Sequence, residues 1–417
     1  MNIRIVFFTW LALIFMGMAT SCVSSPYEGK EMTVLCVPVY GQSYALGEEA
    51  QLITNFDSLR INTNHRVLTQ RLDEDFGYFD NSTFKQFVKR MIRYKKRQFE
   101  LSVYGMADEF FKHCDNDSLL LCTFPGGKGE TSITGMMPGS EPYQKFLDEI
   151  KQAHDKAKDR GWNFYMPAFC WMQGENDIVW QTSKDYKKDL LNWYNRFCID
   201  VKIITGQTEN PVCICYQSNC LSLSKLPVAD TIYNRPEMYV PNAQYQLIRD
   251  EKNFMASGPS YPYKVVNERV HIDGEGQQSI GRLAGLTLWR ILNKQNSDGL
   301  QLADYLVSDS TVALRFNVPN PPLCLDTIQV KNPGNYGFTI ITPEGRNICK
   351  RVTLDNDSIV LLHYMGDITH ASLRYAVNGI FDKNGNKNGA RGCLRDSKND
   401  CTKEVYNWAY QFEVALK

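Results

Sequence analysis

The sequence predicts the α/β fold class, with a parallel α/β domain followed by an antiparallel β-sandwich. Up to about residue 295, short apolar runs alternate with helical patterns, which is typical of a parallel sheet with right-handed crossovers. After the turn-forming segment 296–299, the chain changes to short segments separated by Pro-, Gly- and Asn-rich pieces, which indicates a β-sandwich. We therefore expect one domain over residues 26–297 and a second over 300–417, in keeping with the length of 417 residues.

The parallel sheet is predicted from four largely apolar runs, whose composition suits strands buried on both faces. They span residues 32–39, 117–124, 164–171 and 212–216. Each run ends at a polar segment, and most of these segments contain glycine. Because chemistry in open α/β sheets collects at the carboxyl ends of the strands, these segments are the first candidates for a site.

The helices are predicted from apolar residues that recur three and four positions apart among charged ones. The helical stretches are 143–157, 184–203 and 275–294. The last follows Asp273-Gly274, which is typical of a helix start, and it should close the first domain. In the second domain, residues 311–316 and 338–341 have the composition of short strands.

The N-terminus has the pattern of an export signal. An apolar run over 5–16 follows a basic residue and precedes small residues that end at Cys22, so residues 1–22 are predicted to be a signal peptide. The run is shorter than the roughly 20 residues of a membrane span. The residues before Cys22 resemble a bacterial lipobox, although Ala19 replaces the usual leucine. We expect an exported protein in the periplasm or at the cell surface, lipid-anchored through Cys22, with plain secretion as the alternative.

The bulk composition limits the possible partners. Lys plus Arg and Asp plus Glu both total 46, so no net charge would attract nucleic acid or an anionic membrane surface. Apolar residues make up 43% of the chain and aromatic residues 12%, which is enough for sizeable cores. The composition therefore favours a globular protein that does not bind nucleic acid.

Cysteines are numerous for an exported protein. Setting Cys22 aside leaves twelve of the thirteen, an even number compatible with disulfides of unknown connectivity. Cys213, Cys215 and Cys220 lie close together, but no paired histidine or Cys-x-x-Cys accompanies them. We therefore favour small buried side chains over a zinc site.

The first chemical element is Ser43, which follows the first buried run within Gly41-Gln42-Ser43. Its hydroxyl would stand at the carboxyl edge of the sheet. A serine attacks a carbonyl only with a general base nearby and with donors facing the developing oxyanion. Alone, this motif is more typical of a turn serine.

The second element is Asn176, in the segment 171–177 that ends the third buried run. An asparagine side-chain N–H is a suitable donor to an oxyanion. The alternative is an Asn-Asp loop that satisfies its own backbone.

The third element is His271, just before the last predicted helix. Glu268 stands three residues earlier, and a carboxylate so placed can accept a hydrogen bond from the imidazole and leave the other nitrogen free to take the serine proton. Its competitor is His370, within Asp367-Ile368-Thr369-His370. Because His370 falls in the predicted β-domain, far from the other two elements, we expect His271 to be the base.

In this order, the three elements resemble the SGNH, or GDSL-like, hydrolase superfamily, and within it the sialate O-acetylesterase-like branch of carbohydrate acetylesterases. Gly41-Gln42-Ser43 is similar to the nucleophile block of that branch, 171–177 to its Trp-x-Gln-Gly-Glu block, and His271 to its late Asp-x-x-His block. The resemblance covers roughly residues 32–295. It implies a flavodoxin-like three-layer α/β/α domain, acyl transfer to water without a metal or other cofactor, and O-acetylated carbohydrate as the substrate.

The resemblance also implies roles for residues. Ser43 would be the nucleophile and an oxyanion donor through its backbone N–H, His271 the base, and Asn176 a side-chain donor. Gly105 is expected to supply a further backbone N–H because it precedes a helix-like stretch, with Gly127 as the alternative. Gln173 is expected to share the donor role.

Two departures from the family pattern matter. Glu268 stands where aspartate is usual, which leaves Glu175 and Asp273 as alternative partners of His271. Tyr44 replaces the asparagine that often follows the nucleophile in sialate esterases, which puts sialic acid in doubt as the sugar.

Two other functions fit parts of the sequence. A glycosidase would use paired carboxylates, with Glu175 and either Asp177 or Glu268 as acid and base. A glycan-binding lipoprotein would use aromatic residues of the β-domain, although such residues are more often core. Loss of activity on removal of the Ser43 hydroxyl would separate the esterase from both.

Overall fold

The computed structural model describes most of the chain after residue 26. The predicted signal peptide, Cys22, Cys220 and Glu268 lie outside the described residues. The described residues are 27, 29–70, 75–78, 99–180, 182–219, 239–266, 270–295, 297–377, 379–381, 387–397, 401 and 405–416.

The first domain is built on a parallel sheet whose strands run in the flavodoxin-like order 2-1-3-4-5. Three of these strands are interrupted, and two of the interruptions contain Pro38 and Pro167, which have no N–H to donate. Across the sheet the strands are β5 (Leu119–Cys122) with β6 (Pro125–Gly127), β1 (Thr33–Cys36) with β2 (Val39–Gly41), β7 (Asn163–Tyr165) with β8 (Ala168–Met172), β9 (Val212–Gln217) and β10 (Phe254–Pro259). Beyond β5, β3 (Val67–Thr69) adds a parallel strand and β4 (Gly77–Tyr78) an antiparallel one.

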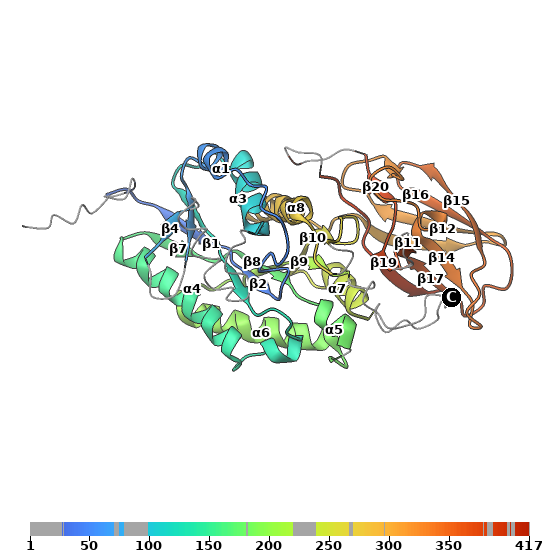
Figure 1. Ribbon diagram of the computed structural model, residues 1–417, viewed down its shortest axis with the longest axis horizontal. Helices are drawn as coiled ribbons and strands as arrows, with labels where there is room; N and C mark the ends of the chain where they lie inside the picture. Colours follow the sequence, from blue (N-terminus) through green and yellow to red (C-terminus); the bar gives the residue numbers. More distant parts are fainter. Residues whose placement is uncertain are drawn as a thin grey trace, which may run out of the picture.

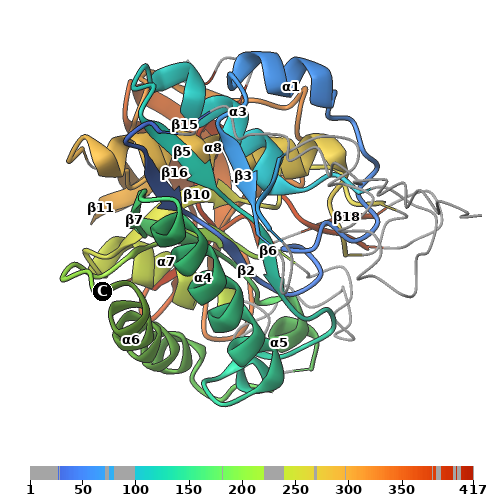
Figure 2. The ribbon, with the colours of Figure 1, turned by 90° about the vertical axis from the view of Figure 1, so that its left-hand side faces the viewer.

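Helices cover both faces of this sheet (Figures 1 and 2). On one face lie α1 (Phe56–Asn62), α3 (Ser102–His113) and α8 (Gly274–Leu292), and on the other α4 (Glu141–Asp159) and α6 (Tyr186–Thr205). The remaining helices are η2 (Ile133–Met136), α5 (Glu175–Trp180) and α7 (Tyr239–Asp250). Helix α8 begins where predicted, because the Asp273 side chain accepts a hydrogen bond from Gly276 N at 3.0 Å. The predicted three-layer α/β/α arrangement is confirmed.

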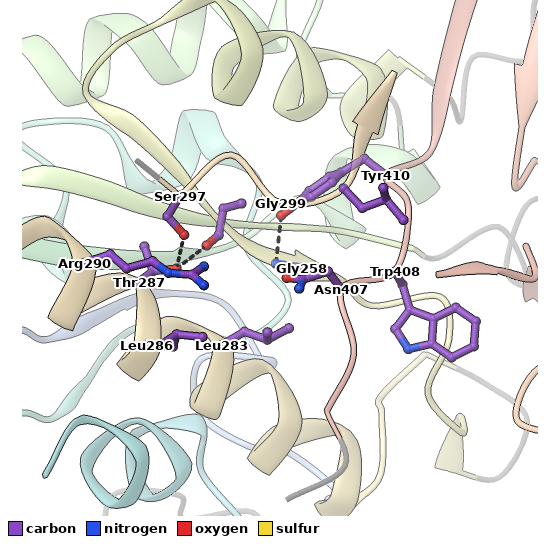
Figure 3. A pocket seen from close by; sticks show the side chains of 12 residues that line it. Gly258, Leu283, Leu286, Thr287, Arg290, Ser297, Gly299, Asn407, Trp408 and Tyr410 are labelled. Atoms are coloured by element: carbon purple, nitrogen blue, oxygen red, sulfur yellow. Dashed lines mark hydrogen bonds between the residues drawn. The ribbon is translucent and has the colours of Figure 1, made fainter. Parts of the chain in front are cut away.

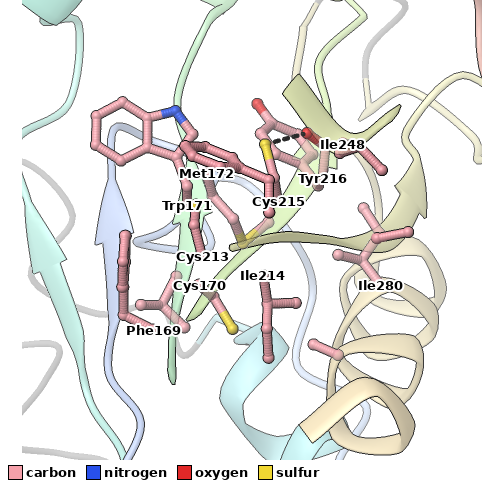
Figure 4. Close-up of a cluster of buried hydrophobic side chains, with 14 of the residues drawn as sticks. Phe169, Cys170, Trp171, Met172, Cys213, Ile214, Cys215, Tyr216, Ile248 and Ile280 are labelled. Carbon is pink, nitrogen blue, oxygen red and sulfur yellow. Dashed lines mark hydrogen bonds between the residues drawn. The ribbon is translucent and has the colours of Figure 1, made fainter. Parts of the chain in front are cut away.

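The core of this domain is centred on β8 and β9 (Figure 4). Cys213 and Cys215 are fully buried in β9, and all cysteines of the described residues are free thiols. Among the residues that the structure describes, no group of three potential ligands could hold a metal ion. These two cysteines therefore pack as small apolar side chains. Within the same residues, no helix has the length and apolar character needed to cross a bilayer.

The second domain consists of antiparallel sheets that pack as a β-sandwich (Figure 1). Helix α8 ends at Leu292 and the first strand of this domain begins at Gln301. One sheet contains β11 (Gln301–Val307), β12 (Thr311–Asn317), β16 (Ile359–Tyr364) and β15 (Cys349–Asn356), and another contains β14 (Phe338–Ile341), β17 (Ser372–Tyr375) and β21 (Phe412–Ala415). Shorter pieces are β13 (Leu323–Leu325) with β20 (Leu394–Asp396), β18 (Gly379–Phe381) with β19 (Lys387–Ala390), and η6 (Asn335–Gly337).

Candidate active site

Ser43 lies in a tight turn that directly follows β2. The turn is closed by the hydrogen bond from Glu48 N to Ser43 O at 3.0 Å, and Ser43 is only 4% exposed. Strand β2 is paired with β8, at the point where the strand order of the sheet reverses. In folds of this order, ligands bind in the crevice at that switch point. Ser43 therefore stands where a substrate would enter.

Glycines let three strand ends approach one another beside Ser43. A Cβ on Gly41 would lie 2.0 Å from the carbonyl oxygen of Met172, the last residue of β8. Gly127 ends β6 with φ of 109°, and a Cβ there would lie 1.8 Å from the Gly41 carbonyl oxygen. A side chain at either position would force the backbones apart. The glycines are thus required by the close approach that forms the site.

His271 is brought to the Ser43 turn from more than two hundred residues away. Its Nδ1 lies 2.8 Å from Glu49 Oε2, and its Nε2 lies 4.0 Å from Glu48 Oε2. The ring centroids of His271 and Tyr44 are 5.9 Å apart, and the Tyr44 hydroxyl donates to Val270 O at 2.5 Å. In the described residues, the Ser43 hydroxyl makes no hydrogen bond to His271. Catalytic hydrogen bonds are often open without substrate, so the arrangement is compatible with a serine and its base.

Glu49 is the carboxylate that orients His271 in the structure. Its backbone is left-handed, with φ of 64°, a conformation that glutamate rarely adopts and that is enriched at functional sites. A carboxylate on Nδ1 holds the proton there and leaves Nε2 as the base. Glu49 was not among the residues predicted from the sequence, although it lies only six residues after Ser43.

The other proposed partners of His271 have different places. Glu268 lies outside the described residues. Asp273 caps α8, and Glu175 accepts from the Tyr216 hydroxyl, so neither expectation of an orienting role holds in the structure. His370 is exposed in the turn between β16 and β17 of the β-sandwich.

Asn176 is hydrogen-bonded to Gln42, the residue before Ser43. Its backbone N–H donates to Gln42 Oε1 at 3.3 Å, while its side chain is half-buried and has no hydrogen-bond partner among the described residues. The Asn176 amide is therefore free to donate to an oxyanion. Gln42, 2% exposed, thus links the ends of β2 and β8, a role that sequence reasoning did not assign.

Gln173 does not have the donor role expected for it. Its Nε2 donates to Gln42 Oε1 at 3.2 Å and to Asp177 Oδ2 at 2.5 Å, and its Oε1 accepts from Tyr186 at 2.8 Å. Both amide protons are used, so none remains for a substrate. Gln173 instead links the end of β8 to Gln42, Asp177 and Tyr186.

Gly105 packs between α3 and α8, and its expected role as a backbone donor to the oxyanion stays a prediction. It is the fourth residue of α3, and it is buried. A Cβ on Gly105 would lie 2.4 Å from Gln278 O of α8, so this glycine serves helix packing. The stated alternative, Gly127, lies beside Gly41.

The paired carboxylates of a glycosidase are not presented to solvent. Glu175 and Asp177 are 1% and 3% exposed, and Asp177 accepts from Ile133 N at 2.8 Å. Burial raises the pKa of Glu175 to about 7, with partial opposition from its hydrogen bond to Tyr216. Burial likewise raises the pKa of Asp177. Both groups accept buried hydrogen bonds that hold the segment containing Asn176 in place.

The chain is similar in fold to solved structures of other proteins. No protein-family model and no curated protein sequence matches the chain. Among solved structures, a carbohydrate acetylesterase from Xanthomonas citri is similar over 92% of this chain and 80% of its own, with a TM-score of 0.59 and 10% identity. The chain has the fold of the SGNH hydrolases.

Two further solved structures have lower TM-scores against this chain. NanS is covered over 99% of its chain and 64% of this one, with 12% identity and a TM-score of 0.43. A carbohydrate acetylesterase from Sinorhizobium meliloti is covered over 100% of its chain and 63% of this one, with 10% identity and a TM-score of 0.33. The assignment of the SGNH fold therefore depends on the first structure and on the strand order.

Proposed function

We propose that the chain is a serine esterase that removes acyl groups, chiefly O-acetyl groups, from carbohydrate. The observation that carries the proposal is the His271–Glu49 pair at 2.8 Å, formed on the same turn that begins with Ser43 at the switch point of the sheet. A serine, an imidazole and a carboxylate form the machinery of acyl transfer on several unrelated folds. The similar structure from Xanthomonas citri is a carbohydrate acetylesterase, which suggests acetylated carbohydrate as the substrate.

The proposed reaction begins when Ser43 Oγ attacks the ester carbonyl and its proton moves to His271 Nε2. Glu49 stabilises the imidazolium that results. The backbone N–H groups of Ser43 and Gly127 and the Asn176 side chain would hold the developing oxyanion. The bond between the acyl carbon and the sugar oxygen then breaks as His271 gives its proton to that oxygen, which leaves an acyl group on Ser43. A water molecule, with its proton taken by His271, attacks the acyl-serine, and the acid and the free Ser43 hydroxyl are released.

The test is release of p-nitrophenol from p-nitrophenyl acetate by the purified mature chain. We expect Ser43→Ala and His271→Ala to lose about 10³-fold or more in kcat. His370→Ala, a histidine exposed on the β-sandwich, is the matched control and should retain wild-type kcat. Activity that survives Ser43→Ala would contradict the proposal, and loss with His370→Ala alone would reassign the base.

The substrate class requires its own measurement. Acetate release from acetylated xylo-oligosaccharides, peracetylated hexoses and O-acetylated sialic acid can be followed by an acetate-coupled assay. The proposal predicts a higher kcat/KM on at least one acetylated sugar than on ethyl acetate, an alkyl ester with a comparable leaving group, because sugar contacts add binding energy in the transition state. Equal or lower values on every sugar would contradict carbohydrate as the substrate.

We also propose that the chain is exported and lipidated on Cys22. The support is the apolar run over 5–16 and the small residues before Cys22. Metabolic labelling with an alkyne fatty acid should mark the wild-type chain and not Cys22→Ser. Absence of label on an exported wild-type chain would instead favour plain secretion.

A further inference from the structure

The β-sandwich packs against the edge of the sheet from which the His271 segment leaves. Gln217, the last residue of β9, and Gln411 bond reciprocally: Gln217 Nε2 donates to Gln411 O at 2.8 Å, and Gln411 N donates to Gln217 Oε1 at 2.7 Å. In β10, Gly258 N donates to the Tyr410 hydroxyl at 2.7 Å (Figure 3). All four residues are buried. The two domains therefore share a polar, fully desolvated seam at the carboxyl ends of β9 and β10.

Tyr261 joins this seam to the His271 segment. It follows β10 directly and is fully buried. Its hydroxyl donates to Ala409 O at 2.7 Å and lies 3.0 Å from the Tyr375 hydroxyl. Its carbonyl oxygen accepts from Arg391 Nη1 at 2.9 Å. Both ends of Tyr261 are thus held by the β-sandwich.

The described residues before and after the His271 position, 261–266 and 270–273, are bonded to each other, and we call them the His271 loop. Val265 and Ile272 form an antiparallel bridge, Val266 N donates to His271 O at 2.7 Å, and Asp273 N donates to Lys264 O at 3.0 Å. Because these bonds connect the residues after Tyr261 to those beside His271, a shift at Tyr261 would act on the position of the imidazole.

Tyr44 is a second support of that loop, through its hydrogen bond to Val270 O and its ring contact with His271. Burial lowers the pKa of Arg391, and charge interactions with Tyr44 and Tyr261 partly oppose that shift. The loop is thus held by Tyr44 at Val270 and by Arg391 at Tyr261.

We propose that the β-sandwich positions the catalytic base, and that Arg391 is the positioning residue, fixing the start of the His271 loop through the Tyr261 carbonyl. This inference depends on the proposed esterase function. It gives the β-sandwich a part in catalysis that does not require it to bind sugar.

The test compares Arg391→Gln and Arg391→Lys in the full mature chain, with Arg315→Gln as the matched control. Arg315 is an arginine of the same domain whose side chain is 60% exposed and whose nearest carboxylate oxygen, on Asp304, is 3.9 Å away. We expect Arg391→Gln to lower kcat on p-nitrophenyl acetate about tenfold or more with KM changed by less than roughly threefold, because a misplaced base affects the chemical step. Arg391→Lys, which keeps a charged donor, should recover part of the loss, and Arg315→Gln should match the wild type.

A spectroscopic readout separates this inference from the proposed function. The His271 Nδ1 proton, assigned by its absence in His271→Ala, should give a downfield proton resonance that Arg391→Gln broadens or shifts. Unchanged kcat and an unchanged resonance in Arg391→Gln would overturn the inference even if the wild type is an active esterase. A wild type without esterase activity, but with a resonance that depends on Arg391, would overturn the proposed function and leave the positioning contact supported. If Arg391→Gln does not fold, the same criteria apply to Arg391→Lys.

Discussion

Replacement of Glu49 by glutamine tests whether Glu49 orients His271, because it removes one charge and leaves the side-chain shape nearly unchanged. Glu49 Oε2 lies 2.8 Å from His271 Nδ1, and the Glu49 side chain is 26% exposed, so the pair is largely shielded from solvent. A charge-assisted hydrogen bond contributes about 1.5–3 kcal/mol and a neutral one about 0.5–1.5 kcal/mol.

The change therefore removes about 1–2 kcal/mol of stabilisation from the imidazolium, which corresponds to a loss of roughly 5- to 30-fold in kcat. If the new amide turns its N–H toward Nδ1, it also selects the wrong tautomer, and the loss extends toward about 10⁴-fold. KM should change little, since Glu49 does not contact the ester in the proposed reaction.

The assay is steady-state hydrolysis of p-nitrophenyl acetate by the Glu49→Gln, Glu48→Gln and Glu268→Gln variants. Glu48 is the matched control: it precedes Glu49 in the same turn, but its carboxylate is 4.0 Å from Nε2 and is not bonded to the ring. We expect Glu48→Gln to change kcat by less than about fivefold. Wild-type kcat in Glu49→Gln together with a large loss in Glu268→Gln would refute the reasoning and restore Glu268 as the orienting residue.

Three further outcomes are expected. Asn176→Ala should lower kcat by about 10²- to 10³-fold with a small change in KM, as measured by steady-state kinetics, and retention of full kcat would remove Asn176 from the oxyanion site. Gly105→Ala should lower the thermal midpoint, because its Cβ would lie 2.4 Å from Gln278 O, and an unchanged midpoint would contradict the helix-packing role. In the folded chain Glu175 holds its proton up to a pKa of about 7, whereas in the unfolded chain its pKa is near the ordinary value. The stability of the fold should therefore fall by about 3 kcal/mol as the pH rises from about 4.5 to 7. The free energy of unfolding in urea should not show this decline with pH in Glu175→Gln, and should show it in the control Glu141→Gln, whose side chain is exposed. An identical decline in both variants would contradict the assignment of the pH dependence to Glu175.

The sequence was informative where local composition decides structure. The run 32–39 contains β1 and the first residue of β2, the run 164–171 most of β7 and β8, and the run 212–216 most of β9, because strands buried on both faces must be apolar throughout. Strand β10 was not predicted. It contains Ser257 and Gly258, and the Gly258 N–H finds its partner on Tyr410 of the other domain. Such a long-range contact leaves no mark in local composition.

The site was predictable to a similar extent. Ser43 and His271 were selected by their positions after a strand and before a helix, and the structure places both on bonded turns at the expected edge of the sheet. The partner of His271 could not be selected in that way, because the search for a carboxylate was limited to the neighbours of His271 in sequence. Glu49 reaches the ring across 222 positions, and only the fold brings it there.

The most direct test of the central claim is to locate the nucleophile by covalent labelling. The wild-type chain would be incubated with a fluorophosphonate, which reacts with activated serines, and the labelled peptide identified by mass spectrometry. We expect one label, on Ser43, and a labelling rate that falls in His271→Ala and Glu49→Gln. A label on another serine, or undiminished labelling of Ser43→Ala, would contradict it.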